Sequence, residues 1–62
     1  MTREEEVNLC ISSLKQKIVL SAQSIEGYIG LNEDLYYLCE ESIEELQDLM
    51  KYINELEELN KD

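Results

Sequence analysis

Residues 40–59 read EESIEELQDLMKYINELEEL, and this stretch decides the fold. It contains eight carboxylates and one lysine, yet an apolar side chain returns at every third or fourth position. That spacing places the apolar residues along one face of an α-helix and leaves the acids on the remaining faces. The stretch therefore predicts an amphipathic helix with a buried stripe and a strongly negative solvent side.

The same periodicity continues upstream, so we expect this helix to cover residues 33–59. Asn32 is suited to the N-cap, and acids at the next two positions favour the first turn. Leu31 and Tyr36 have the spacing of a hydrophobic staple around that cap. The expected apolar stripe is flanked by Tyr36, Ile43 and Met50 and consists of Leu35, Cys39, Ser42, Leu46, Leu49, Ile53 and Leu56.

An earlier helix is expected over residues 3–27. Thr2 and Glu5 form a capping-box pattern at its start. Gly27 and Gly30 are placed to end it, because glycine tolerates the left-handed conformation that closes many helices. Its apolar positions alternate spacings of four and three, which is typical of packed helices, and they are Val7, Ile11, Leu14, Ile18, Ile25 and Tyr28.

The expected fold class is therefore all-α, an antiparallel two-helix hairpin in a single domain over residues 1–62. Two helices cannot cover stripes this wide, so we expect two hairpins to form a four-helix bundle as a homodimer. A bundle shared with another protein and a lone monomer remain open. The residues expected in the dimer core are Ile11, Leu14, Ile18, Ile25, Leu35, Ile43, Leu46, Leu49, Met50, Ile53 and Leu56.

The charge is strongly negative and unevenly placed. The formal net charge is −10, and residues 33–62 hold eleven acids and two bases. Such a chain is repelled by nucleic acid and by anionic membranes, so neither is an expected partner. Residues 1–10 do not read as a secretion signal, and no apolar run is long enough for a membrane span. We expect a cytoplasmic protein with reduced thiols at Cys10 and Cys39.

The sequence offers little for catalysis. It contains no histidine, and both cysteines lie on or beside the apolar stripes, where cysteine behaves as a small hydrophobe. A two-helix hairpin also has no deep cavity in which carboxylates could be oriented. We therefore expect a protein that is not an enzyme and that has no metal site and no cofactor.

The acids of residues 40–58 suggest a function of another kind. This segment spans ~27 Å as a helix and carries roughly one outward charge per 5 Å, compared with one phosphate per ~3.4 Å along a nucleic-acid strand. The sequence thus predicts a small acidic regulatory protein, an inhibitor that occupies the basic, nucleic-acid-binding surface of a larger protein. Such proteins resemble inhibitors encoded by phages or plasmids. The residues expected to contact the partner are Tyr37, Glu40, Glu41, Glu44, Asp48, Glu55 and Glu58. An acidic face that only keeps the chain soluble remains the alternative.

The opening MTREE and the length of the hairpin are similar to the Rop family. That resemblance implies an antiparallel four-helix bundle made by two copies, and a regulator that binds paired RNA loops through its first helix. Here the corresponding outer face has Lys15 and Lys17 as its bases and no aromatic residue. A Rop-like RNA-binding regulator and a purely structural dimerisation element are therefore kept as alternatives.

Overall fold

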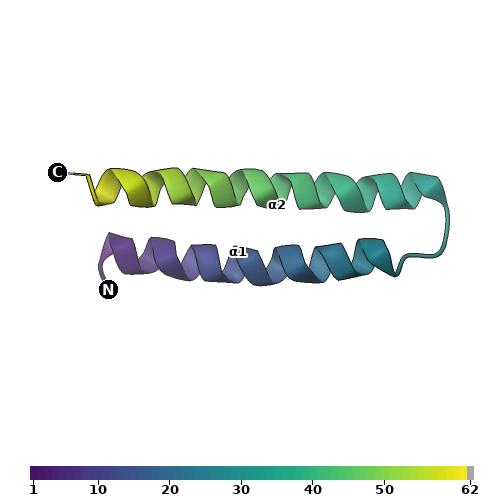
Figure 1. Cartoon of the computed structure of the whole chain (residues 1–62), viewed down its shortest axis with the longest axis horizontal. Helices are drawn as coiled ribbons and strands as arrows, with labels where there is room; N and C mark the ends of the chain where they lie inside the picture. The colour runs from purple at the N-terminus through teal and green to yellow at the C-terminus, as the bar shows by residue number, and fades with distance from the viewer. Residues whose placement is uncertain (62) are drawn as a thin grey trace.

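The chain folds into two long antiparallel α-helices joined by a short loop (Figure 1). The computed structural model describes residues 1–61. Helix α1 spans Arg3–Glu26 and helix α2 spans Asn32–Leu59. The expected all-α hairpin is confirmed, and each helix end lies within one residue of its expected position.

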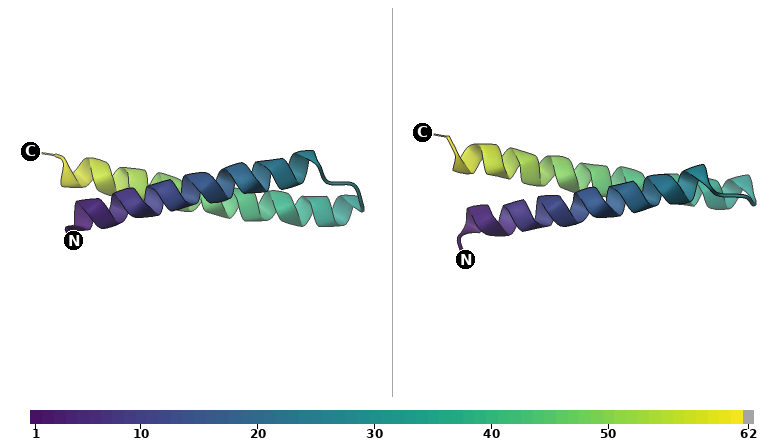
Figure 2. Two further views of the ribbon diagram at one scale, coloured as in Figure 1. Left: turned by 90° about the horizontal axis from the view of Figure 1, so that it is seen from below. Right: turned by 60° about the horizontal axis from the view of Figure 1, so that its bottom comes forward.

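The hairpin is a rod of 49 × 16 × 13 Å. The helices lie side by side along their whole length and cross at a shallow angle, with the start of α1 and the end of α2 at the same end of the rod (Figures 1 and 2). Such a shape follows from the short loop, which forces the second helix to return along the first. It also gives each helix one neighbour only, so much of each helix surface is left uncovered.

The start of α1 has the cap that the sequence predicts, whereas its end does not. The Thr2 side-chain oxygen accepts a hydrogen bond from the backbone N–H of Glu5 at 3.2 Å, as the capping pattern predicts. At the other end Gly27 has φ −89° and ψ 3°, and its N–H donates to the Gln23 carbonyl at 3.0 Å. The expected left-handed glycine is wrong, since no glycine in residues 1–61 has positive φ. The last turn closes in ordinary right-handed geometry instead.

Helix α2 begins one residue earlier than its sequence pattern suggests. Leu31 occupies the N-cap in an extended conformation, and its carbonyl accepts from the Leu35 N–H at 3.2 Å. The expected Asn32 cap is therefore wrong, and no side chain caps this helix. The staple between Leu31 and Tyr36 fails for the same reason, and both side chains are exposed. The acids Glu33 and Asp34 do lie in the first turn, where the helix dipole favours them.

The loop depends on a close approach at Gly30. The Tyr28 ring lies across this residue, and its hydroxyl donates to the Asp34 carboxylate at 3.1 Å. A Cβ added at Gly30 would lie 2.6 Å from the Tyr28 hydroxyl oxygen. A side chain at position 30 would therefore displace the Tyr28 ring, whereas the conformational freedom of glycine is not used here.

The interface between the helices is narrow, and in residues 1–61 only Val7 and Ile11 are buried. The face of α2 that meets α1 is shifted toward one edge of the expected stripe, so that Leu35, Leu49 and Leu56 stay partly buried. Leu46 and Ile53, expected on the stripe, are exposed, whereas Glu45 is partly buried. One helix can cover only part of a stripe this wide, and α1 covers the edge opposite Ile43 and Met50, where Leu38 and Tyr52 lie. The partly buried aliphatic and aromatic positions of the two helices are Leu14, Ile18 and Ile25 in α1 and Leu35, Leu38, Leu49, Tyr52 and Leu56 in α2.

Candidate interaction surfaces

One broad side of the hairpin is acidic. Two adjoining shallow hollows, of about 450 Å³ and 260 Å³, run between the helices there and share Lys17 and Asp48. The larger hollow brings Leu20 of α1 against the carboxylates of Glu41 and Glu44. We call this surface the acidic side, and its residues are Cys10, Ser13, Lys17 and Leu20 of α1 and Glu41, Glu44, Asp48 and Tyr52 of α2.

Within residues 1–61, the carboxylates of Glu41, Glu44 and Asp48 form no ion pair with a basic side chain. Glu41, Glu44 and Asp48 are exposed and follow one another at helical spacings of three and four. Within the part of the chain that the structure describes, the ion pairs all involve Arg3, which contacts Glu6 and Glu55. The charge of the acidic side is therefore available to a cationic partner. Like charges at these spacings also repel one another within the helix.

The residues expected to contact a partner are not all equivalent. Tyr37, Glu40, Glu41, Glu44, Asp48 and Glu58 are exposed on α2. Glu55 is instead partly buried and engaged by Arg3, whose Nη2 donates to Glu55 Oε1 at 2.9 Å while its Nε donates to the other oxygen. These hydrogen bonds are the main cause that lowers the pKa of Glu55 below its ordinary value. The charge of Glu55 is thus largely offset within the chain.

The Arg3–Glu55 pair was missed by reasoning from sequence. The feature that could have indicated this pair is the hairpin, because antiparallel helices bring the first residues of α1 against the last turns of α2. Arg3 is the basic residue at that end of α1, and Glu55 is one of several acids it could have met. Sequence alone gives no way to choose among those acids.

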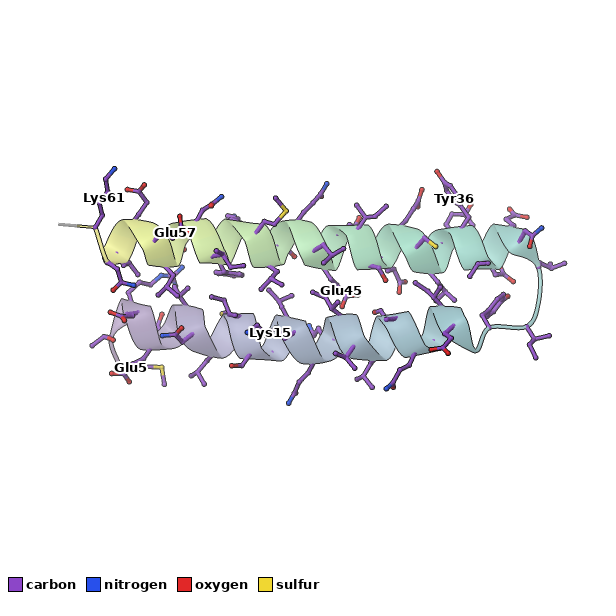
Figure 3. All side chains as sticks on the ribbon, viewed as in Figure 1. Glu5, Lys15, Tyr36, Glu45, Glu57 and Lys61 are labelled. Carbon is purple, nitrogen blue, oxygen red and sulfur yellow. The ribbon has the colours of Figure 1, made fainter. Side chains whose placement is uncertain are left out.

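A small polar layer interrupts the apolar contact halfway along the hairpin. Glu45 points toward α1, and the Ser21 hydroxyl donates to its carboxylate at 2.8 Å (Figure 3). The Ser42 hydroxyl lies nearby in sequence and is buried without a hydrogen-bond partner in the described chain. Sequence reasoning missed Glu45 as well. The available signal was its seven-residue spacing from Leu38 and Tyr52, which puts all three on one line of α2.

The opposite broad side of the hairpin is apolar. On α2 the exposed fraction is 52% for Ile43, 45% for Leu46, 63% for Met50 and 39% for Ile53. These residues recur at helical spacings and therefore form one stripe. Since Lys17, Leu20 and the carboxylates line the acidic side, the remaining flanks of the two helices share this other side. We call it the apolar side, formed by Cys39, Ile43, Leu46, Met50 and Ile53 of α2 and by Ser12, Lys15, Val19 and Ala22 of α1.

The residues expected in a dimer core fall into two groups. Ile43, Leu46, Met50 and Ile53 are exposed in the single chain and belong to the apolar side. The others are buried or partly buried between α1 and α2, namely Ile11, Leu14, Ile18, Ile25, Leu35, Leu49 and Leu56. A second hairpin would therefore cover only the first group directly.

An aromatic pair lies at the loop end of α2. The rings of Tyr36 and Tyr37 meet edge to face, with centroids 6.1 Å apart and planes at 77°. Tyr36 points away from α1 (Figure 3), and both side chains are exposed. Tyr37 precedes the first carboxylates of the acidic side by about one helical turn. Its exposed ring therefore continues the acidic side toward the loop.

Neither cysteine forms a disulfide within residues 1–61. Cys10 and Cys39 are free and partly buried. In residues 1–61 no group of three or more histidine, cysteine or acidic side chains is arranged to hold a metal ion. Over the same residues, neither helix combines the length and apolar character that would let it cross a lipid bilayer.

No protein-family model, curated protein or solved structure matches the chain. The resemblance to the Rop family therefore stays a prediction from the sequence.

Proposed function

We propose that the protein is a small acidic regulator that acts by binding another protein. Two copies pack through their apolar sides, and each leaves its acidic side facing outward. That acidic side occupies a basic surface with which the target protein would otherwise bind nucleic acid. The observation that carries the proposal is the separation of charge, with the unpaired carboxylates on one broad side and the exposed aliphatic residues on the other.

The geometry of the acidic side suits a basic protein surface. Glu41, Glu44 and Asp48 lie about 4.5 Å and 6 Å apart along the axis at a rise of ~1.5 Å per residue. This spacing is comparable to that of phosphates along a nucleic-acid strand. Leu20 forms an apolar wall of the larger hollow, so the stem of a lysine or arginine could lie against it while the head meets a carboxylate.

The test compares two variants that change the net charge equally. One carries Glu41→Gln, Glu44→Gln and Asp48→Asn on the acidic side. The control carries Glu4→Gln, Glu5→Gln and Glu33→Gln, which are exposed elsewhere. Proteins captured by the unmodified chain from its host are purified and assayed for nucleic-acid binding, with each variant added as a competitor.

The unmodified chain and the control should displace nucleic acid from the captured protein, and the acidic-side variant should compete on the order of tenfold less well. Competition should also weaken steeply as salt rises, because the contact is made by exposed charges. Equal competition by both variants, or no dependence on salt, would show that the acidic side serves only solubility.

A second candidate is a purely structural assembly element, and the exposed apolar side favours it. In that case pairing of the chains is the whole function, and the carboxylates only keep the bundle in solution. Removing the acidic-side charges would then leave activity in the host intact. The variant Leu46→Glu, which places a charge on the apolar side, would abolish it.

A further inference from the structure

The single chain exposes more surface than its mass requires. A compact monomer of 7.3 kDa is expected to expose ~4,200 Å². This chain exposes 5090 Å². The excess, on the order of 900 Å², is close to the ~800 Å² that each partner buries in a stable protein interface. The rod therefore has about the uncovered area that one further copy would remove from water.

The distribution of charge selects the side on which an acidic partner can dock. Two copies that each carry a net charge of −10 repel one another at their acidic sides. The barrier is smaller on the apolar side, because its carboxylates, Glu26 and Glu57, lie toward its ends and helical spacing places the uncharged amides of Gln47 and Asn54 along the outer edge of its stripe. Lys15 is the charged residue near its centre. A second copy is therefore the occupant that this surface fits.

Resting on the homodimer proposed above, we infer a specific arrangement of the two copies. The α2 helices lie antiparallel on one another, and the two-fold axis passes at the level of Leu46 and Val19. The spacing within α2 leads to this arrangement, because Ile43 lies three residues before Leu46 and Met50 four residues after it. Antiparallel packing sets Ile43 against the partner's Met50. It likewise sets Cys39, seven residues before Leu46, against the partner's Ile53.

Contacts between the helices identify the residue of α1 that lies level with Leu46, and therefore with the two-fold axis. The hydrogen bond from Ser21 to Glu45 aligns these two residues, and Lys17 lines the same hollows as Asp48. Val19 lies between Ser21 and Lys17 in sequence and is therefore nearly level with Leu46. It is 55% exposed and lies on the flank of α1 that belongs to the apolar side. One axis thus sets Val19 against the partner's Val19 and Leu46 against the partner's Leu46.

The charges at the edges of this side distinguish antiparallel from parallel packing. Lys15 lies four residues before Val19, and Glu26 lies seven residues after it on the same flank. Antiparallel packing offsets Lys15 from the partner's Glu26 by only three residues, about 4.5 Å along the axis, which a lysine side chain spans. A parallel pair of α2 helices would stack Glu57 on the partner's Glu57, whereas antiparallel packing sets Glu57 near the partner's Tyr36.

Cysteine cross-linking in the full chain tests the arrangement. All variants carry Cys10→Ser and Cys39→Ser, so each retains only the cysteine that is introduced. A disulfide needs Cα atoms within about 7 Å of each other. Chains with Ile43→Cys mixed with chains with Met50→Cys should give mainly the mixed disulfide dimer on mild oxidation. The variant Leu46→Cys alone should cross-link to its own copy, whereas Leu9→Cys, exposed on the outer face of α1, should not.

The cross-linking results distinguish an error in the packing arrangement from an error in the proposed homodimer. If Ile43→Cys chains cross-link to themselves in preference to Met50→Cys chains, the helices are parallel and the inference is wrong. If the unmodified chain has the mass of a dimer but neither Leu46→Cys nor the mixture cross-links, the copies pair elsewhere and only the arrangement fails. A chain that stays monomeric would contradict both the arrangement inferred here and the proposed homodimer. Competition for a basic target is measured separately and does not depend on any of these outcomes.

Charge reversal provides a second readout that does not depend on oxidation. Lys15→Glu should weaken the dimer about threefold, in the range of exposed ion pairs. Adding Glu26→Lys should restore the original affinity. The two residues are eleven positions apart on one helix, so they cannot pair within a chain. Failure of the double variant to recover would contradict antiparallel packing of the α1 helices.

Discussion

The Ser21 hydroxyl and the Glu45 carboxylate form a 2.8 Å hydrogen bond across the interface between α1 and α2. The bond joins the two helices at mid-length, and it places a carboxylate where an apolar residue would pack more simply. It also accompanies the rotation of α2 that turns Leu46 and Ile53 toward solvent. The exposure of the apolar side is thus linked to a polar contact inside the hairpin.

Removing the donor of this bond should destabilise the hairpin. Ser21→Ala leaves a partly buried carboxylate without its partner, and we expect the free energy of unfolding to fall by about 1 kcal/mol. Ser24→Ala is the matched control, since Ser24 is exposed on the same helix and gains the same helix propensity. Urea unfolding followed by circular dichroism measures both. A Ser21→Ala chain as stable as the control would mean that the bond contributes nothing.

The Arg3–Glu55 pair predicts a dependence of stability on pH. Hydrogen bonds from Arg3 hold the pKa of Glu55 in the folded chain below its ordinary value of 4.5. The pair therefore stabilises the fold fully above that pH, and its contribution is lost as the pH falls through the folded pKa. Protonation of the other acids acts in the opposite direction, because it relieves repulsion in a chain of net charge −10.

The contribution of the pair is isolated by comparison with Glu55→Gln. The unmodified chain should be more stable than this variant at neutral pH, and the difference should shrink below pH 4.5. Thermal unfolding of both chains across this range measures the difference. A difference that stays constant with pH would mean that the pair does not hold Glu55 ionised.

The loop predicts a specific effect of Gly30→Ala. The new Cβ would meet the Tyr28 ring, so the ring must move and its hydroxyl should leave Asp34. Partial desolvation and the contact with Asp34 raise the pKa of Tyr28 above its ordinary value of 10.0. In Gly30→Ala one tyrosine should therefore titrate at lower pH than before, as measured by tyrosinate absorbance. Asp34→Asn is the comparison, and an unchanged titration in Gly30→Ala would contradict the close approach.

The acidic side should reduce stability in the chain that carries it. Glu41, Glu44 and Asp48 repel at helical spacings of three and four, by about 0.2–0.5 kcal/mol for each pair. Glu41→Gln with Glu44→Gln should therefore raise the free energy of unfolding by a few tenths of a kcal/mol, and more at low salt. If the same variant also loses target binding, the carboxylates are kept for function at the expense of stability. A loss of stability on neutralisation would contradict this view.

The sequence predicted the hairpin well because its signals are local. The capping pattern at Thr2 and the three- and four-residue spacings determine the helices, and the short loop determines their antiparallel return. The rotation of α2 was not predictable, because its apolar stripe is wider than the face that α1 can cover. The helical periodicity is compatible with burial of either edge of that stripe. In the folded chain α1 packs against the edge with Leu38 and Tyr52.

The same limit applies to the acidic side. Exposure of Tyr37, Glu40 and Glu44 follows from the helix pattern, whereas the engagement of Glu55 by Arg3 depends on how the two ends of the hairpin meet. Periodicity assigns a residue to a face of its own helix. It does not say which residue of the other helix lies opposite.

Pairing of two chains through their apolar sides is tested by the mass of the unmodified chain in solution, measured by sedimentation equilibrium over a wide concentration range. We expect twice the 7.3 kDa of a single chain, with dissociation and loss of helix together on dilution. Leu46→Glu should shift this equilibrium toward the monomer. A chain that remains monomeric and cooperatively folded at high concentration, with its apolar side open to water, would rule out this pairing.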